Sequence, residues 1–281
     1  NKMESMKLEP TLSELKQAAF DAIERERESI FGLSKYINQN PETAYKETKS
    51  VKALTEFFVN NEFSIQSSAG GLDTAFVAQF GTPGSGGAVP VALIAEYDAL
   101  EGVGHGCGHN LIAASAAAAG KGVAAALKIL KNPENYCFQV IGTPAEEVMT
   151  DIAGKNRLIE AGVFENVGAC LMFHPWTRTG VAKKDLGCTA FRITFKGKPA
   201  HAAADPWNGL NALDAAVSFY TSISMLRQQL PSGFKLHCIL PEGGRVLNVI
   251  PELAVAEVML RSTELEQLED VESRVRACAE A

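Results

Sequence analysis

The 281-residue sequence has little positive charge, few histidines and no long uninterrupted apolar run. Its 26 Lys and Arg residues against 33 Asp and Glu residues give a net charge of −7, so it lacks the basic stripe that binds nucleic-acid phosphates or anionic lipid. No stretch reaches the ~18 continuous apolar residues that span a bilayer, and the N-terminus lacks the apolar core of a secretion signal. These absences predict a cytoplasmic protein with a small-molecule partner and neither a nucleic-acid nor a membrane partner.

Paired cysteine spacings are also missing. The six cysteines lie far apart, and three of them fall in the apolar runs "YCFQVIG", "ACLMF" and "LHCIL". Such cysteines are typically small buried residues in a reducing compartment. The sequence contains no Ser-His-Asp nucleophile elbow, and its Gly-rich stretch "GTPGSGG" has no following Lys, so we expect a flexible turn there and not a phosphate-binding loop.

The first 185 residues carry the pattern of an α/β domain. Apolar residues at three- to four-residue spacing predict a helix over residues 11–38 and a second over 46–58. The strand-like runs "TAFVAQFG", "VPVALIAEY", "YCFQVIG" and "GACLMF" follow, with helix-like segments such as the Ala-rich stretch 111–130 between the later ones. Apolar strands separated by helices are typical of a mostly parallel sheet covered by helices.

The pattern changes at residue 186. A strand, a helix over 209–230, two further strands and an amphipathic helix over 262–281 follow in the order βαββα. This order predicts a ferredoxin-like α+β domain over 186–281 that lacks its last strand. Because the closing helix has neither a cap nor a following strand, we expect the chain to be C-terminally truncated.

Potential metal ligands follow the predicted strands. In parallel sheets, ligands bind beyond the carboxyl ends of the strands, and three such ends run into "GHGCGHN", "TPAEE" and "FHP". The Cys107 thiolate and the His109 and His174 imidazoles suit Zn²⁺. Taken singly, these residues are compatible with an ordinary glycine turn or a solvated histidine. Three of the five histidines lie in these loops, and this concentration favours a metal site.

Adjacent carboxylates in "TPAEE" suit a hydrolytic metal centre. One of Glu146 and Glu147 can bind a cation while the other takes a proton from water. Glu-Glu pairs are also common on solvated surfaces. Their position behind a proline, directly after an apolar strand, weakens that alternative.

Six ordered motifs resemble a known family. The stretches "AEYDAL…GHGCGHN", "GTPAEE", "MFHP", "GKPAHAA", "GLNALDA" and "NVIP" cover most of residues 30–261. They are similar to the two-metal amidohydrolases and dipeptidases of metallopeptidase family 20, in the branch with hippurate hydrolase, auxin-conjugate hydrolases, aminobenzoyl-glutamate hydrolase and Xaa-Arg or β-alanyl-lysine dipeptidase. The resemblance implies a zinc-exopeptidase-like catalytic domain and an inserted satellite domain that forms a homodimer.

The resemblance also implies roles for individual residues. Cys107, His109, Glu147 and His174 become ligands of two divalent cations, with Zn²⁺ expected first and Mn²⁺ or Co²⁺ as alternatives. Glu146 becomes the general base and Asp98 a carboxylate that orients a ligand. His201 becomes the oxyanion-stabilising histidine that reaches into the partner subunit's site. Asn248 and Arg261 match substrate-holding positions.

The expected reaction is hydrolysis of the amide bond of a dipeptide or an N-acyl amino acid. Asn110 stands where many relatives have Asp, which favours a dipeptide. The family has a final metal-binding histidine in a later segment, so this chain is expected to be an incomplete catalyst. A non-catalytic metal-binding or dimerisation fragment is the first alternative, and a thiol redox protein that uses Cys107 is the second.

Overall fold

The computed structural model describes residues 9–82, 89–148, 152–181 and 186–281. The Gly-rich turn expected near residues 83–88 and the stretch 182–185, next to the expected domain boundary, lie outside the described residues. The chain divides into two compact units, Asn1–Arg178 and Thr179–Ala281.

The first unit is built on a mixed sheet whose strands lie in the order β1-β2-β4-β3-β5. Its strands are β1 (Ser64–Ser67), β2 (Phe76–Phe80), β3 (Val91–Glu96), β4 (Phe138–Thr143) and β5 (Ala169–Leu171). Strand β3 pairs in parallel with both β4 and β5, whereas β2 is antiparallel to both its neighbours. The edge strand β1 was not predicted, because its polar sequence "SIQS" shows no apolar alternation.

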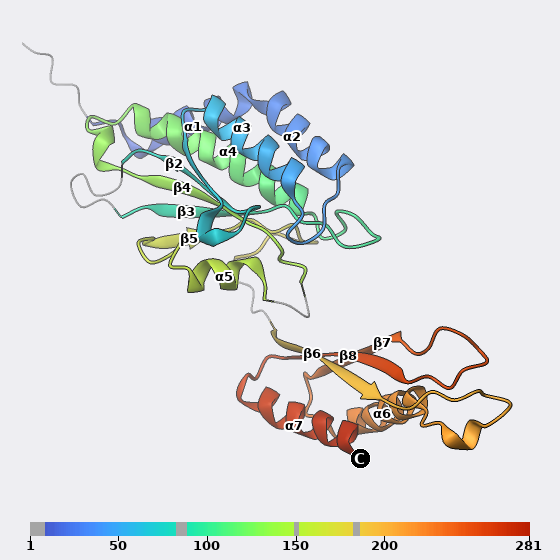
Figure 1. Cartoon of the computed structure of the whole chain (residues 1–281). Coiled ribbons are helices and arrows are strands. Elements are labelled where there is room, and N and C mark those ends of the chain that lie inside the picture. Colours follow the sequence, from blue (N-terminus) through green and yellow to red (C-terminus); the bar gives the residue numbers. More distant parts are fainter. Residues whose placement is uncertain (1–8, 83–88, 149–151, 182–185) are drawn as a thin grey trace, which may run out of the picture. The chain divides into compact units, whose positions relative to one another are not determined.

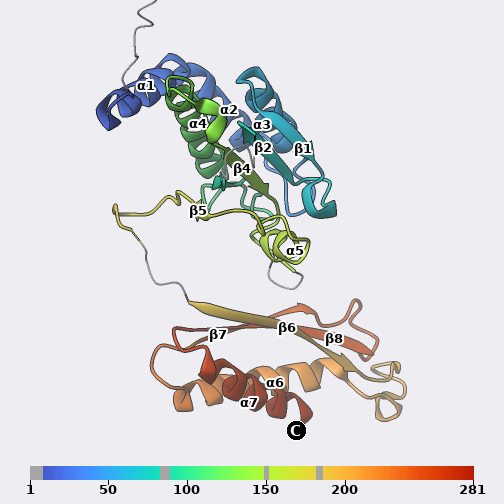
Figure 2. The same ribbon diagram turned by 90° about the vertical axis from the view of Figure 1, so that its left-hand side faces the viewer.

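Helices cover both faces of this sheet (Figure 1). They are α1 (Leu12–Arg25), α2 (Arg27–Gln39), α3 (Thr48–Asn60), α4 (His109–Lys128) and α5 (Gly154–Glu160). Helices α1 to α4 lie on one face and α5 lies on the other (Figures 1 and 2). The prediction of one helix over 11–38 is wrong: α1 ends at a Glu26 cap, with φ −95° and ψ 7°, and α2 begins at Arg27. The apolar spacing continues across this break, so periodicity alone could not detect it.

Helix α4 is the central helix of the first unit. It is long and apolar enough to cross a membrane by length and composition, but half of its most apolar window is buried. Ala113 and Ala117 are fully buried in a core that also contains Ile37, Phe58 and Tyr97. At Gly120 a Cβ atom would lie 3.2 Å from the Phe58 ring, so the small residues of α4 allow close packing. This packing fixes the N-terminus of α4 at the edge of the sheet.

The second unit has a three-stranded antiparallel sheet in the order β6-β8-β7. Its elements are β6 (Gly187–Lys196), α6 (Ala212–Leu226), β7 (Lys235–Glu242), β8 (Leu253–Ser262) and α7 (Glu266–Glu280). Both helices lie on one face of the sheet (Figure 2), where Phe219, Val258 and Val271 form a buried core. The predicted βαββα order is therefore confirmed.

Short 3₁₀ helices complete the described secondary structure. They are η1 (Ala69–Gly71), η3 (Pro133–Asn135), η4 (Pro206–Asn208) and η5 (Arg227–Gln229). The last of these continues α6, so the predicted helix over 209–230 is split into an α-helix and a 3₁₀ turn.

Candidate metal centre

A glycine turn positions His109 at the start of α4. Gly108 has φ +86°, a left-handed conformation that side-chain-bearing residues rarely adopt, and a Cβ atom there would lie 3.0 Å from Pro175 Cγ. The loop after β3 and the loop after β5 can therefore approach each other at this point. This approach brings His109 and His174 to one place, with ring centroids 6.5 Å apart.

Asp98 orients the buried imidazole of His109. The His109 Nδ1 atom lies 2.9 Å from Asp98 Oδ1 and 2.9 Å from the Asp98 carbonyl oxygen, so it carries the hydrogen and donates it. Asp98 Oδ2 also accepts the Glu147 backbone N–H at 2.9 Å. Burial would raise the pKa of Asp98, but the hydrogen bonds from His109 and from the Glu147 N–H lower it overall. One carboxylate thus fixes residues from two separate loops.

The other nitrogen of His109 faces three carboxylates. Nε2 lies 3.5 Å from Glu96 Oε2, 3.7 Å from Glu146 Oε2 and 3.7 Å from Glu147 Oε1. Burial alone would lower the pKa of His109, but the hydrogen bond to Asp98 and the nearby negative charges raise it. Among the described residues, Nε2, Glu96 Oε2 and Glu147 Oε1 are buried without a hydrogen-bond partner. Buried acceptor atoms that lack hydrogen-bond partners and face the same point can serve as ligands of a cation.

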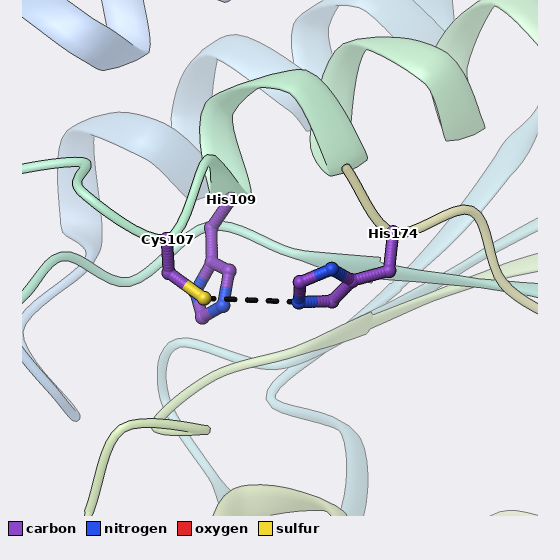
Figure 3. A group of neighbouring side chains, drawn as sticks. All are labelled: Cys107, His109 and His174. Atoms are coloured by element: carbon purple, nitrogen blue, oxygen red, sulfur yellow. Dashed lines mark hydrogen bonds between the residues drawn. The ribbon is translucent and has the colours of Figure 1, made fainter. Parts of the chain in front are cut away.

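Cys107 and His174 complete the cluster (Figure 3). Cys107 Sγ lies 3.7 Å from His174 Nε2, while His174 Nδ1 lies 2.8 Å from the Pro175 carbonyl oxygen. Ligand atoms of Cys107, His109 and His174 all lie within 4.8 Å of one another, and the same holds for His109, Glu146 and Glu147. Thiolate, imidazole and carboxylate donors in this arrangement fit a divalent transition metal.

The thiol of Cys107 is unsuited to redox chemistry by itself. Burial and the carboxylates of Glu147, Glu146 and Glu96 raise its pKa to about 12, so it carries a proton at neutral pH. A redox cysteine needs a lowered pKa, which disfavours the thiol redox alternative. A cation at this site would displace the thiol proton.

Burial also affects Glu146. It raises the pKa of this carboxyl, and Glu96 raises it further, although Lys155 acts in the opposite direction. A raised carboxyl pKa is suited to a group that must accept and then release a proton.

Two residues near this site were missed in the sequence. Glu96, with 1% of its side chain exposed, forms an ion pair with Lys155 on α5. The two-residue period of a strand places Glu96 and Asp98 on the same side, which could have indicated Glu96. Nothing in the sequence indicated Lys155. Asn110, by contrast, donates its amide hydrogen to Ser34 Oγ of α2 at 3.0 Å, a partly buried contact between α4 and α2.

The structure brings together two of the three predicted site residues of the second unit. His201 pairs with Val249 in an isolated bridge, and Ala202 N donates to Asn248 O at 2.9 Å. His201 Nδ1 accepts hydrogen bonds from the backbone N–H groups of Ala203 and Ala204 at 3.2 and 3.1 Å. Its ring hydrogen is therefore on Nε2.

Arg261 lies elsewhere in the second unit. It is the ninth residue of the ten-residue strand β8 and pairs with Cys188, whereas Leu253, next to the loop with Asn248, pairs with Lys196 at the other end of β6. Within this unit, Arg261 is therefore not near His201 and Asn248.

Models of known protein families match both parts of the sequence. The family model described as "Peptidase family M20/M25/M40" matches residues 88–233, and the model of a peptidase dimerisation domain matches residues 186–281. The chain is 39% identical to Xaa-Arg dipeptidase of Mus musculus over 95% of its length, and 31% identical to a p-aminobenzoyl-glutamate hydrolase of Escherichia coli (strain K12) over 92%. It spans 63% and 56% of the lengths of these two relatives.

Solved structures share the fold. An aminobenzoyl-glutamate utilization protein from Klebsiella pneumoniae matches 93% of this chain and 73% of its own, with a TM-score of 0.69 and 18% identity. A dinuclear metal-binding peptidase of the M20 family from Bacillus subtilis matches 91% of this chain and 70% of its own, with a TM-score of 0.61 and 21% identity. The family model matches more than half of the sequence, and it shows that the chain belongs to the M20 family of peptidases.

Proposed function

We propose that the protein is a metal-dependent hydrolase that cleaves the amide or peptide bond of a dipeptide or an N-acyl amino acid. The observation that carries this proposal is the convergence of thiol, imidazole and carboxylate donors from three separate loops on one point. Cys107, His109, Glu147 and His174 would hold one or two divalent cations, with Zn²⁺ the first candidate and Mn²⁺ or Co²⁺ the alternatives. A cation bound there supplies Lewis acidity to a water molecule and to the carbonyl group of the substrate.

Glu146 is the proton-transfer residue in this proposal. Its Oε2 lies 3.7 Å from His109 Nε2, and 40% of its side chain is exposed, so water and substrate can reach it. The carboxylate takes a proton from the attacking water and then gives a proton to the leaving amine. The raised pKa of the carboxyl group supports both steps.

His201 supplies a hydrogen-bond donor in this proposal. Because its Nδ1 accepts two backbone hydrogen bonds, Nε2–H is free to donate to the oxygen on which negative charge develops. Asn248, on the neighbouring loop, and Arg261 are proposed to hold the substrate, with the arginine pairing with a substrate carboxylate.

The two relatives name two substrate classes, a dipeptide for Xaa-Arg dipeptidase and an N-acyl amino acid for p-aminobenzoyl-glutamate hydrolase. Xaa-Arg dipeptidase and p-aminobenzoyl-glutamate hydrolase both have names that describe cleavage next to an amino acid with a charged side chain. The first is the more similar in sequence, so Xaa-Arg and Xaa-Lys dipeptides are the substrates to try first. We also propose a cytoplasmic location, which the six free cysteines support.

The first experiment compares Glu146→Gln with wild type, both made as the full-length protein, on these dipeptides. We expect turnover to fall by at least about 100-fold while metal content stays unchanged, because the substitution removes the proton acceptor and keeps the shape. Glu160→Gln, at an exposed position on α5, is the matched control. Retained turnover with a full metal load would contradict the role of Glu146, and metal binding without any turnover in wild type would favour the non-catalytic alternative.

A second experiment tests the homodimer, which the match to a dimerisation domain supports. If His201 acts in the partner subunit's site, Glu146→Gln and His201→Ala should each be inactive alone. Mixing and re-associating the two variants should recover about a quarter of wild-type activity, because half of the dimers are mixed and each mixed dimer has one intact site. Absence of recovery would indicate that His201 acts within its own subunit, whereas full activity of His201→Ala alone would indicate that His201 has no catalytic role.

A further inference from the structure

The lone pairs of His109 Nε2 and Glu96 Oε2 face each other. Because His109 Nδ1 donates its hydrogen to Asp98, Nε2 presents a lone pair when the ring is neutral. Glu96 Oε2 faces it at 3.5 Å, and neither atom has a hydrogen-bond partner among the described residues. Two buried acceptors in this position repel each other unless a proton or a cation lies between them.

The separation of these atoms fits two ligands of one cation. Bonds of about 2.0–2.1 Å from Zn²⁺ to nitrogen and oxygen, at a tetrahedral angle, place the two ligand atoms about 3.4 Å apart. The observed distance from His109 Nε2 to Glu96 Oε2 is 3.5 Å. It is shorter than the 3.7 Å from the same nitrogen to Glu146 Oε2 and to Glu147 Oε1.

Lys155 holds the other side of the Glu96 carboxylate. Its ammonium pairs with Glu96 Oε1 and leaves Oε2 directed at His109. The position of Lys155 is set by Gly154, where a Cβ atom would lie 1.9 Å from the Pro144 carbonyl oxygen. Only glycine therefore lets α5 begin this close to the loop after β4. A solely structural buried ion pair would be expected to satisfy both carboxylate oxygens, and this pair satisfies one.

We propose that Glu96 is a further ligand of the cation site and that Lys155 is the positioning residue that directs its free oxygen to the cation. The inference rests on the proposed function, because it assumes that a cation binds at His109. It adds a ligand from the sheet itself to those on the loops. It also gives a role to Lys155. A positive charge beside the carboxylates opposes the binding of a metal cation, so its presence there is explained if the lysine orients Glu96.

Cobalt binding by the metal-stripped protein tests this inference. Co²⁺ is titrated into wild type and Glu96→Gln, and affinity is measured by calorimetry while the visible spectrum reports the ligands. We expect Glu96→Gln to weaken Co²⁺ binding by about 10–100-fold and to change the spectrum, and Lys155→Met to weaken it by about tenfold. Glu62→Gln is the control, because it removes one carboxylate charge, that of Glu62 in its exposed ion pair with Lys128 in the same unit. It should leave the Co²⁺ affinity and the visible spectrum unchanged.

The outcomes separate this inference from the proposed function. Wild-type affinity and spectrum in Glu96→Gln would overturn the assignment of Glu96, while the metal centre would stand. Failure of wild type to bind Co²⁺ would overturn the metal centre itself. If Glu96→Gln loses its fold by circular dichroism, Glu96→Asp carries the same test, because it keeps the charge and withdraws the carboxylate by one methylene. Wild-type binding by that variant would then overturn the inference.

Discussion

The Nδ1 atom of His109 lies 2.9 Å from Oδ1 of Asp98, and both side chains are almost completely buried. This hydrogen bond decides which imidazole nitrogen is free to face the neighbouring carboxylates. It joins the end of strand β3 to the start of α4 across the Gly-rich loop. The chemistry proposed for the site depends on this orientation.

Removal of the Asp98 carboxylate should weaken metal binding. We expect Asp98→Ala to lower the affinity for Zn²⁺ by about 10–100-fold, because the ring of His109 loses its orienting partner and the Glu147 N–H loses its acceptor. Calorimetric titration of the metal-stripped protein measures this change. Asp21→Ala, at an exposed position on α1, serves as the control. Equal affinities for both variants would show that Asp98 does not orient a ligand.

Cys107 should resist alkylation in metal-stripped protein. A shift of its pKa from 9.0 to about 12 makes the reactive thiolate fraction about a thousandfold smaller than that of an unshifted thiol. Mass spectrometry after a timed iodoacetamide reaction should show slow labelling of Cys107 and faster labelling of the exposed Cys188. Comparable rates at mildly alkaline pH would mean that the carboxylates around Cys107 do not raise its pKa.

Glu47 should make the stability of the first unit depend on pH. Burial raises its pKa above the ordinary value of 4.5, so the native state bears the cost of a buried charge once the pH exceeds that raised pKa. Glu47→Gln keeps an oxygen that can accept the N–H groups of Tyr45 and Ala145. Relative to wild type, this variant should be more stable at neutral pH and should lose that advantage as the pH falls toward 4.5.

Urea unfolding at several pH values measures the effect of Glu47. In Glu47→Ala both N–H groups lose their acceptor, so we expect a destabilisation of roughly 1–3 kcal/mol for each group at every pH. A stability difference between wild type and Glu47→Gln that does not change with pH would contradict the raised pKa.

Gly142 should be needed for packing in the sheet. Residue 142 of β4 pairs with Phe76 of β2, and a Cβ atom at 142 would lie 2.2 Å from the Phe76 ring. We expect Gly142→Ala to lower the free energy of unfolding by about 1–3 kcal/mol. Gly32→Ala on α2 meets no atom within 4 Å and should stabilise by up to about 1 kcal/mol through helix propensity. Thermal unfolding distinguishes the two, and equal effects would contradict the packing argument.

His201 should populate a single tautomer. Because the N–H groups of Ala203 and Ala204 donate to Nδ1, its neutral ring should carry hydrogen on Nε2. Nitrogen-15 chemical shifts of the imidazole, assigned by comparison with His201→Gln, report the tautomer directly. Shifts typical of a ring with hydrogen on Nδ1 would remove the donor proposed for the oxyanion.

The sequence alone determined the fold class and the position of the metal-ligand candidates. Apolar strands alternating with helices required a covered sheet, and the parallel pairing of β3 with β4 and β5 brought their carboxyl ends together. The residues that follow these strands, Cys107, His109, Glu146, Glu147 and His174, are therefore gathered at one sheet edge. Local periodicity was sufficient for the strands and the places where they end, whereas the choice of metal ligands among the residues there depended on their side-chain chemistry and on the resemblance of the motifs.

Tertiary structure alone decided the contacts between distant segments. Glu96 and Lys155 are separated by 59 positions, and their pairing depends on how closely α5 packs against the loop after β4. The break between α1 and α2 at Glu26 and the edge strand β1 were also invisible in the pattern of apolar residues. Periodicity reports which side of an element is buried, whereas the partner of a buried charge is set by packing of the whole unit.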